Sequence, residues 1–351
     1  MDIRTWLLDS DPALRWQVLQ DLLDAPEDQI RAERARVARE GWGARLLALR
    51  GPDGLWAQGA CFPDTAHLHR PERMRDPGPE PSPSPTPWEQ EPEGTPGPDE
   101  GQPWTATYPT LDLLLEFGVD PDDPAMRTTT DLVAANCLWE EGGQPYFSGE
   151  VEPCINGRTL RQAHYFGYTD QVAPLVERLL SEQLEDGGWN CEAERGSRRS
   201  SFHSTLCVLQ GLLAHEQATA DQRVRAARRT GEEYLLERHL MRRRSTDEIV
   251  DPTWLQLSFP TQWFYDVLHA LDYFRQAGGP PDPRLAEALD IVVTKRQPDG
   301  RWLLENTHPG AVHFTLEDGD GRPSRWNTLR ALRVLRWAGA DPTDPAASEM
   351  R

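Results

Sequence analysis

The sequence lacks the features that would place it in a membrane or a secretory route. No stretch approaches the roughly 18 consecutive apolar residues of a membrane-spanning helix. The chain begins with Asp2 and Asp9 where a signal peptide carries basic residues and then an apolar run. Its five cysteines, few and odd in number, favour free thiols or metal ligands over a disulfide framework. These absences predict a cytoplasmic protein without a transmembrane segment.

Positive charge is also scarce. The chain has 37 basic and 57 acidic residues and a formal net charge of -20, which disfavours nucleic acid and anionic membranes as partners. Three catalytic motifs are missing as well: the phosphate-binding Gly-x-x-x-x-Gly-Lys-Ser/Thr loop, the His-Glu-x-x-His zinc motif and the Gly-x-Ser-x-Gly nucleophile elbow. The sequence therefore gives no sign of the enzyme classes that these motifs mark.

What the sequence does contain is an internal repeat. The segments 50–56, 183–189 and 296–302 read RGPDGLW, QLEDGGW and RQPDGRW, which reduce to Gln or Arg, two residues, Asp-Gly, one residue and Trp. Each copy follows an amphipathic helical pattern and precedes a more apolar one, so the repeating unit is a pair of antiparallel helices. One such pair cannot bury its apolar face alone, which predicts a stack of pairs. The segments 141–146 and 251–254 lie where further, weaker copies are expected.

The repeat resembles the QW motif of the squalene cyclase and protein prenyltransferase superfamily, although only Gln183 keeps the family's glutamine. The resemblance covers residues from about 28 to 340 and implies an all-α fold, an α/α toroid of five to six helical hairpins around a central cavity. It also implies an enzyme of the terpenoid cyclase or prenyltransferase type that acts on an isoprenoid or another apolar small molecule.

The helical periodicity divides the chain into outer and inner helices. Outer helices are expected at about 28–48, 124–140, 170–184, 221–240 and 282–294. Inner helices are expected at about 104–117, 156–167, 201–215, 260–277 and 324–338, with a helix at 11–24 as a sixth.

Three segments flank or interrupt this ring. Residues 1–27 form a helical segment that packs on the ring or completes it, and residues 341–351 form a flexible tail. Residues 71–103, of which 11 are proline, are expected to leave the ring as an extended or disordered insertion.

In a toroid, the residues that lead into the inner helices converge at one mouth of the cavity. Aromatic rings there suit an isoprenoid chain or a carbocation, and Arg325 suits a phosphate or carboxylate. The alternative for most of these rings is packing between helices. The expected substrate-binding residues are Tyr108, Phe202, Trp263, Tyr265, Arg325, Trp326 and Asn327.

The resemblance also implies a zinc site. Prenyltransferases bind zinc through an Asp-x-Cys motif and a histidine near the start of a later inner helix; Glu152, Cys154 and His203 are similar to these ligands. Cys191 is a further thiolate candidate on the intervening loop. Thiolate, imidazole and carboxylate ligands with one open position suit a catalytic zinc ion. The alternative is that these cysteines are packing residues.

Carboxylates supply the other candidate chemistry. The Asp-x-Asp-Asp letters of class II terpene cyclases occur at 120–123, but they follow an inner helix, so we expect them at the mouth opposite the site, in an ordinary helix connection. Asp266 and Glu152 are the expected catalytic acids. Two alternatives stay open: a non-catalytic toroid that binds a ligand or protein at its rim, and a glycan hydrolase or lyase using Glu150, Glu152, Asp266 and Glu305.

Overall fold

The computed structural model describes residues 2–63 and 102–340, so the expectations for residues 71–101 and for the tail at 341–351 lie outside it. The described chain is mostly helical, as predicted, with 13 α-helices and two pairs of two-residue strands. None of the helices described is both long and apolar enough to cross a membrane.

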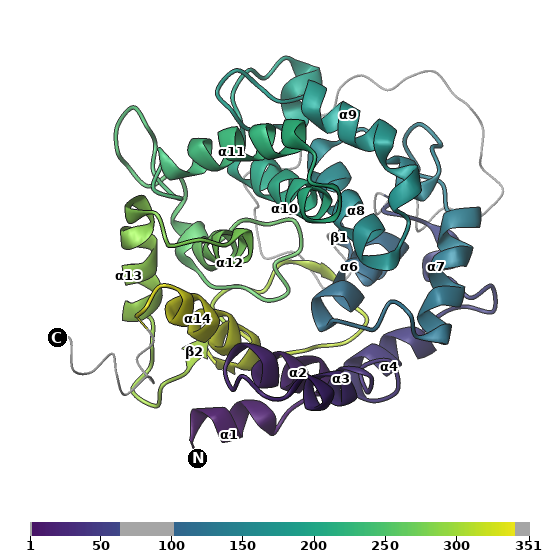
Figure 1. Ribbon diagram of the computed structural model, residues 1–351, viewed down its shortest axis with the longest axis horizontal. Coiled ribbons are helices and arrows are strands. Elements are labelled where there is room, and N and C mark those ends of the chain that lie inside the picture. The colour runs from purple at the N-terminus through teal and green to yellow at the C-terminus, as the bar shows by residue number, and fades with distance from the viewer. Residues whose placement is uncertain (1, 64–101, 341–351) are drawn as a thin grey trace.

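One set of helices lies around the centre of the molecule and the others lie outside them (Figure 1). The inner helices are α2 (Pro12–Asp21), α6 (Thr107–Phe117), α8 (Pro153–Phe166), α10 (Phe202–Thr219), α12 (Val267–Ala277) and α14 (Arg325–Trp337). The outer helices are α1 (Ile3–Leu8), α3 (Glu27–Arg34), α4 (Gly41–Ala48), α7 (Pro124–Asn136), α9 (Ala173–Ser181), α11 (Gln222–Leu236) and α13 (Ala286–Thr294).

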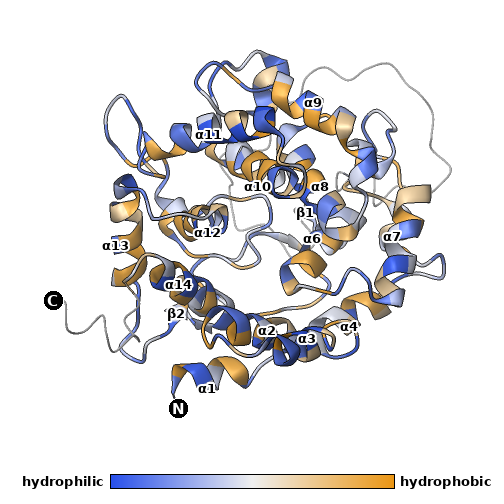
Figure 2. Ribbon diagram, in the orientation of Figure 1, coloured by the Kyte–Doolittle hydropathy of each residue, from blue (hydrophilic) through white to orange (hydrophobic). Residues whose placement is uncertain are grey.

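The inner helices from α6 to α14 pack against their neighbours in chain order, and α2 reaches α6 through the hydrogen bond from Gln17 Nε2 to the Glu116 carbonyl. Helix α8 contacts α6 and α10, α10 contacts α12, α12 contacts α14, and α14 contacts α2, so the last inner helix lies beside the first. The outer helices pack on the inner ones, as α11 does on α10 and α13 on α12. Figure 2 shows hydrophobic residues along α10 and hydrophilic residues along much of α11, as expected for a helix covered on several sides and one that faces solvent.

The three repeat tryptophans occupy equivalent places, as the repeat predicts. Each is at most 1% exposed, and each indole N–H donates to the carbonyl ten residues earlier, near the end of the preceding outer helix. The pairs are Trp56 with Leu46, Trp189 with Leu179, and Trp302 with Val292, at 2.8, 2.7 and 2.7 Å. The indole hydrogen bond therefore holds each turn against the outer helix that the turn ends.

The turns themselves share their backbone geometry. Gly54, Gly187 and Gly300 have φ of 81°, 100° and 89°, a left-handed conformation that favours glycine. In two of the three copies the residue that opens the motif reaches the next outer helix: Gln183 Nε2 donates to the Ala227 carbonyl, and Arg50 Nη1 to the Ala125 carbonyl. Arg50, which stands where the family has glutamine, therefore maintains the contact between neighbouring helical pairs.

Side chains at the ends of the inner helices explain where several of them begin and stop. Ser201 and Ser324 accept hydrogen bonds from backbone N–H groups in the first turns of α10 and α14. Asp266 does the same for α12, so this helix begins at Val267 and the predicted start at 260 is wrong. Gly118 and Gly167 end α6 and α8 in the left-handed conformation.

The short strands hold the connections together. Strand β1 (Gln102–Pro103) pairs in parallel with β3 (Gly310–Ala311), and β2 (Trp302–Leu303) pairs antiparallel with β4 (Pro323–Ser324). The β1–β3 pair joins the start of α6 to the long connection between α13 and α14. This connection therefore reaches the end of the ring at which the inner helices begin.

Candidate functional site

Side chains pack closely where the inner helices begin, which is the predicted rim. Tyr108 and Trp263, both expected to bind substrate, join Phe62, Trp104 and Phe264 in an aromatic cluster. The centroid of the Trp263 ring lies 5.4 Å from those of Phe62 and Trp104, and Trp104 Nε1 donates to the Pro309 carbonyl at 2.8 Å. Tyr108 is 3% exposed. The aromatic cluster thus fills this end of the ring.

Phe202 and Tyr265 form a second group of packed rings. Their centroids lie 5.4 Å apart, and Phe202 lies 4.7 Å from Trp254. The Tyr265 hydroxyl donates to the Leu240 carbonyl at 2.6 Å. Both side chains are buried. Their surroundings are those of packing between helices, which was the alternative to substrate binding.

The three residues that open α14 also lie in packed surroundings. Trp326 stacks on Phe259 at 4.3 Å, and the Asn327 amide donates to the Leu257 and Leu303 carbonyls at 3.1 Å. The Arg325 guanidinium lies 4.7 Å from the centre of the Trp6 ring. It borders a small pocket of about 130 Å³, together with Asp11, Glu317 and others.

Three of the four expected metal ligands come together in the thiol–carboxylate cluster of Glu152, Cys154 and Cys191. Their potential ligand atoms all lie within 4.8 Å of one another. The two Sγ atoms are 2.9 Å apart, and Cys154 Sγ lies 3.5 Å from Glu152 Oε2. The hydrogen bond with Cys191, together with burial, raises the pKa of the Cys154 thiol, and burial raises the pKa of Glu152. The donor set fits zinc, with two sulfurs and one oxygen.

The fourth expected ligand, His203, does not join this group in the described part of the chain. Its Nδ1 accepts a hydrogen bond from the Tyr265 backbone N–H at 3.0 Å, which leaves one ring nitrogen for another partner. Burial lowers the pKa of His203 to about 4, so the ring is neutral near pH 7.

The carboxylates considered for acid–base chemistry have separate partners. Asp266 accepts hydrogen bonds from the Ser258 hydroxyl at 2.8 Å and the His269 N–H at 2.7 Å, and burial raises its pKa. Burial raises the pKa of Glu150 to about 7, and Lys295 Nζ lies 2.7 Å from Glu305 Oε1. None of the three, nor Glu152, lines the central cavity.

That cavity has a volume of about 820 Å³ and opens at the ends where the inner helices stop. The residues that lead into the inner helices, which were expected to converge at one mouth of a cavity, therefore do not line this one. The physical reason is the packing of the aromatic cluster at the end where these helices begin. The cavity is lined from α2, α3, α6, α8, α10, α12 and α14, so residues distant in sequence meet there.

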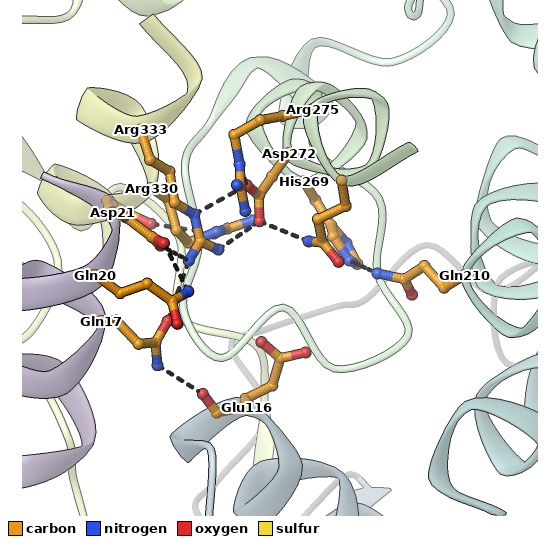
Figure 3. Close-up of polar contacts among 12 residues, drawn as sticks. Gln17, Gln20, Asp21, Glu116, Gln210, His269, Asp272, Arg275, Arg330 and Arg333 are labelled. Carbon is orange, nitrogen blue, oxygen red and sulfur yellow. Dashed lines mark hydrogen bonds and ion pairs between the residues drawn. The ribbon is translucent and has the colours of Figure 1, made fainter. Parts of the chain in front are cut away.

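Polar side chains dominate the wall formed by α2 and α6 (Figure 3). Gln17 Nε2 donates to the Glu116 carbonyl at 3.0 Å, and Gln20 Nε2 donates to Asp21 at 3.0 Å. The Asp21 and Glu116 carboxylates belong to this same wall. It therefore offers mainly hydrogen-bond acceptors to a molecule in the cavity.

Asp272 organises the cavity side of α12 and α14. It is 4% exposed and accepts hydrogen bonds from Arg275 Nε at 2.8 Å, Arg333 Nε at 2.9 Å and Gln276 Nε2 at 3.1 Å. Arg333 Nη1 also donates to Gln17 at 3.1 Å, which ties α14 to α2. Burial raises the pKa of Asp272, but the ion pairs with Arg333 and Arg275 outweigh it and hold the pKa well below its usual range.

The facing wall comes from α8, α10 and α12. Arg161 on α8 donates to Glu116 at 2.6 Å, and Gln210 on α10 is hydrogen-bonded to His269 at 2.9 Å. His164 lies 2.9 Å from His215 through ring nitrogens, and burial together with His215 lowers the pKa of His164 to about 4. Sequence reasoning missed these residues. The available signal was the presence of glutamine and arginine within otherwise apolar inner helices.

The Asp120–Asp123 motif lies in the connection from α6 to α7, at the same end as the cavity but outside it. Asp123 accepts a hydrogen bond from Ala125 N at 3.0 Å and begins α7, and Asp122 pairs with Arg127 at 2.9 Å. These contacts agree with the expected structural role in a helix connection.

Comparison with known proteins identifies no relative: no family model matches the chain, and no curated protein or solved structure gives a significant match.

Proposed function

We propose that the chain is an α/α toroid of six helical pairs whose central cavity binds a polar small molecule. The equivalent repeat tryptophans and the contact between α14 and α2 support the toroid. The cavity carries the functional part of the proposal. At about 820 Å³ it falls within the range of roughly 300–1,000 Å³ typical of small-molecule sites.

The lining favours a polar ligand over an isoprenoid. Arginine, glutamine, aspartate and glutamate side chains face the cavity from at least five inner helices. An apolar chain would remove from water the polar atoms of these side chains that have no protein partner, such as Gln210 Oε1, at a cost of about 1–3 kcal/mol for each such atom. A ligand with hydroxyl or charged groups satisfies them instead.

The test is a thermal-unfolding screen of the purified protein with sugars, sugar acids, sugar phosphates and isoprenoid diphosphates at millimolar concentration. A ligand present at about 100 times its Kd stabilises the folded state by about 2.7 kcal/mol. We expect at least one hydrophilic compound to raise the midpoint.

A blocking substitution then locates the ligand. Ala214→Trp places an indole in the cavity, whereas Ala226→Trp places it on an exposed surface of the outer helix α11. Binding should disappear in the first variant and persist in the second, with circular dichroism showing that both are folded. Equal binding by both variants would exclude the cavity.

The thiol–carboxylate cluster favours a second candidate function, zinc-dependent catalysis of the prenyltransferase type. Glu152, Cys154 and Cys191 would hold the ion, and zinc would supply a Lewis acid or activate a bound thiolate or water there. In this candidate the substrate is an isoprenoid or another apolar small molecule.

Metal analysis tests this candidate directly. Protein purified without chelator should contain about one zinc per chain, and Cys154→Ser should lose it. Cys207→Ser is the matched control, because Cys207 is buried but belongs to no ligand group in the described residues. Zinc-free wild-type protein, or equal zinc in both variants, would eliminate the candidate.

A further inference from the structure

We infer that the ligand of the central cavity is a small hydroxylated oxyanion, with its anionic group on Arg161 and Arg275 and a hydroxyl group on Gln210. This inference rests on the proposed function and names the ligand class for that same cavity. The three side chains lie on the consecutive inner helices α8, α10 and α12, and all three line the cavity.

Gln210 is the most informative of the three. It is 7% exposed, its Nε2 is hydrogen-bonded to His269 Nε2 at 2.9 Å, and its Oε1 is buried with no partner among the described residues. Such an unpaired acceptor inside a protein costs about 1–3 kcal/mol unless a donor meets it. A donor on a molecule in the cavity would remove this cost.

The tautomer of His269 shows which end of the Gln210 amide is free. His269 Nδ1 lies 3.3 Å from the Phe264 carbonyl, which can only accept, so Nδ1 carries the proton. Burial lowers the pKa of His269 well below its usual value, so the ring is neutral and Nε2 is an acceptor. Gln210 must therefore donate through Nε2, which leaves Oε1 for a hydroxyl group of the ligand.

The two arginines supply the complementary donors. Arg275 uses only Nε to contact Asp272, and Arg161 uses only Nη1 to contact Glu116; their remaining N–H groups have no protein partner among the described residues. A guanidinium group binds carboxylates and phosphates through two parallel hydrogen bonds. Both arginines can therefore turn free N–H groups toward an oxyanion.

The charge of the lining agrees with an anion of low charge. Four arginines, Arg34, Arg161, Arg275 and Arg333, line the cavity, against the carboxylates of Asp21 and Glu116. When the buried Asp272 behind them is counted with these carboxylates, the arginines exceed the carboxylates by one charge. This excess stands out in a chain whose formal net charge is -20. The acceptors on α2 and α6 suit the remaining hydroxyl groups of such a ligand.

Isothermal titration with four probes tests the inference: glucose, glucuronate, glucose 6-phosphate and geranyl diphosphate. Glucuronate or glucose 6-phosphate should bind about tenfold to a hundredfold more tightly than glucose, because hydrogen bonds to charged groups are the stronger ones. A preference between the two anions identifies the oxyanion as a carboxylate or a phosphate, and either supports the inference.

Three variants locate the contacts. Arg275→Gln and Arg161→Gln should each remove most of the preference for the anion over glucose, whereas Arg223→Gln, an exposed arginine on the outer helix α11, should not. Gln210→Met should weaken glucose and glucuronate alike, since the hydroxyl contact is common to both. Circular dichroism and the thermal midpoint show whether each variant is folded.

The results that would overturn the inference differ from those that would overturn the proposed function. Glucose binding as tightly as glucuronate, or Arg275→Gln behaving like Arg223→Gln, overturns the inference but leaves a polar cavity site. Geranyl diphosphate binding more tightly than both hydroxylated anions overturns the hydroxyl contact. Binding of these probes that Ala214→Trp does not affect overturns the cavity site itself.

Discussion

The two ends of the inner helices differ in both packing and chemistry. Where these helices begin, the side chains of the aromatic cluster pack together and the repeat tryptophans are buried against the outer helices. Where they stop, arginine, glutamine and carboxylate side chains surround an open cavity. The end at which the inner helices begin thus stabilises the fold. The end at which they stop contains the space for a ligand.

The repeat accounts for this difference between the two ends of the inner helices. Each Asp-Gly turn ends an outer helix, and the indole N–H of its tryptophan donates a hydrogen bond to a carbonyl of that helix. A tryptophan committed to this contact is unavailable to a ligand. The polar residues that face the cavity, mainly arginine, glutamine and carboxylates, stand at positions that share no sequence motif.

The largest expected effect concerns the packed end. Trp189→Ala should lower the free energy of unfolding by about 4 kcal/mol, because it removes a fully buried indole and leaves a cavity. Leu138→Ala, at a side chain that is 55% exposed, should change it by less than about 0.5 kcal/mol. Urea denaturation measures both, and a similar small loss in the two variants would show that the repeat tryptophan is not a structural anchor.

The next effect concerns the cavity end. Asp272→Asn should cost about 3 kcal/mol at pH 7, since it leaves Arg333 and Arg275 without their buried partner. The pKa of Asp272 is depressed in the folded state, so its contribution is present above the unfolded pKa near 4 and is lost as the pH falls below it. The difference in stability between the variant and wild type should therefore narrow progressively as the pH falls from about 4 to about 2. A constant difference over that range would contradict the assignment.

Glu150 at the packed end should respond to pH with the opposite sign. Its folded-state pKa is raised to about 7, so its contribution is present at low pH and is lost as the pH rises through 7. Glu150→Gln should therefore gain about 1–2 kcal/mol relative to wild type between pH 5 and pH 8, allowing for solvent screening. Denaturation at the two pH values, with the exposed Glu177→Gln as control, measures this gain. A gain in both variants, or in neither, would argue against a buried Glu150.

The smallest effect is expected for the Asp-x-Asp-Asp letters. Replacing Asp122 and Asp123 together by asparagine should change stability by about 0.5 kcal/mol or less, because asparagine caps a helix as well as aspartate does. Ligand affinity should stay within about twofold, since neither residue lines the cavity. A tenfold loss of affinity in titration would place one of these acids in the site.

The fold was far more predictable from sequence than the site. Helical periodicity and the repeat located most outer and inner helices, because both depend on local spacing of apolar residues. The single outer helix expected at 28–48 is wrong, since this segment forms two helices, α3 and α4, separated by a turn. The start of α12 was misplaced because the aromatic residues from Trp263 to Tyr265 are as apolar as a buried helix but form a loop before Asp266.

The site depends on features that the sequence carries only indirectly. Cys154 and His203 were expected to lie together because their helices begin in adjacent repeats, but His203 is hydrogen-bonded to Tyr265 and does not join the group. Cys191, the further candidate on the intervening loop, is the residue that lies beside Cys154. Gln210 and Arg275 could not be paired in this way. That both residues line one cavity depends on which face each helix turns to the centre and on which ends of the inner helices are covered by packed side chains.

A crystal structure of the protein with glucuronate would show directly whether the cavity is the binding site. We expect electron density for the ligand in the central cavity, with its carboxylate on Arg161 and Arg275 and a hydroxyl group on Gln210 Oε1. Density beside the thiol–carboxylate cluster of Glu152, Cys154 and Cys191, with the central cavity free of ligand, would contradict this expectation.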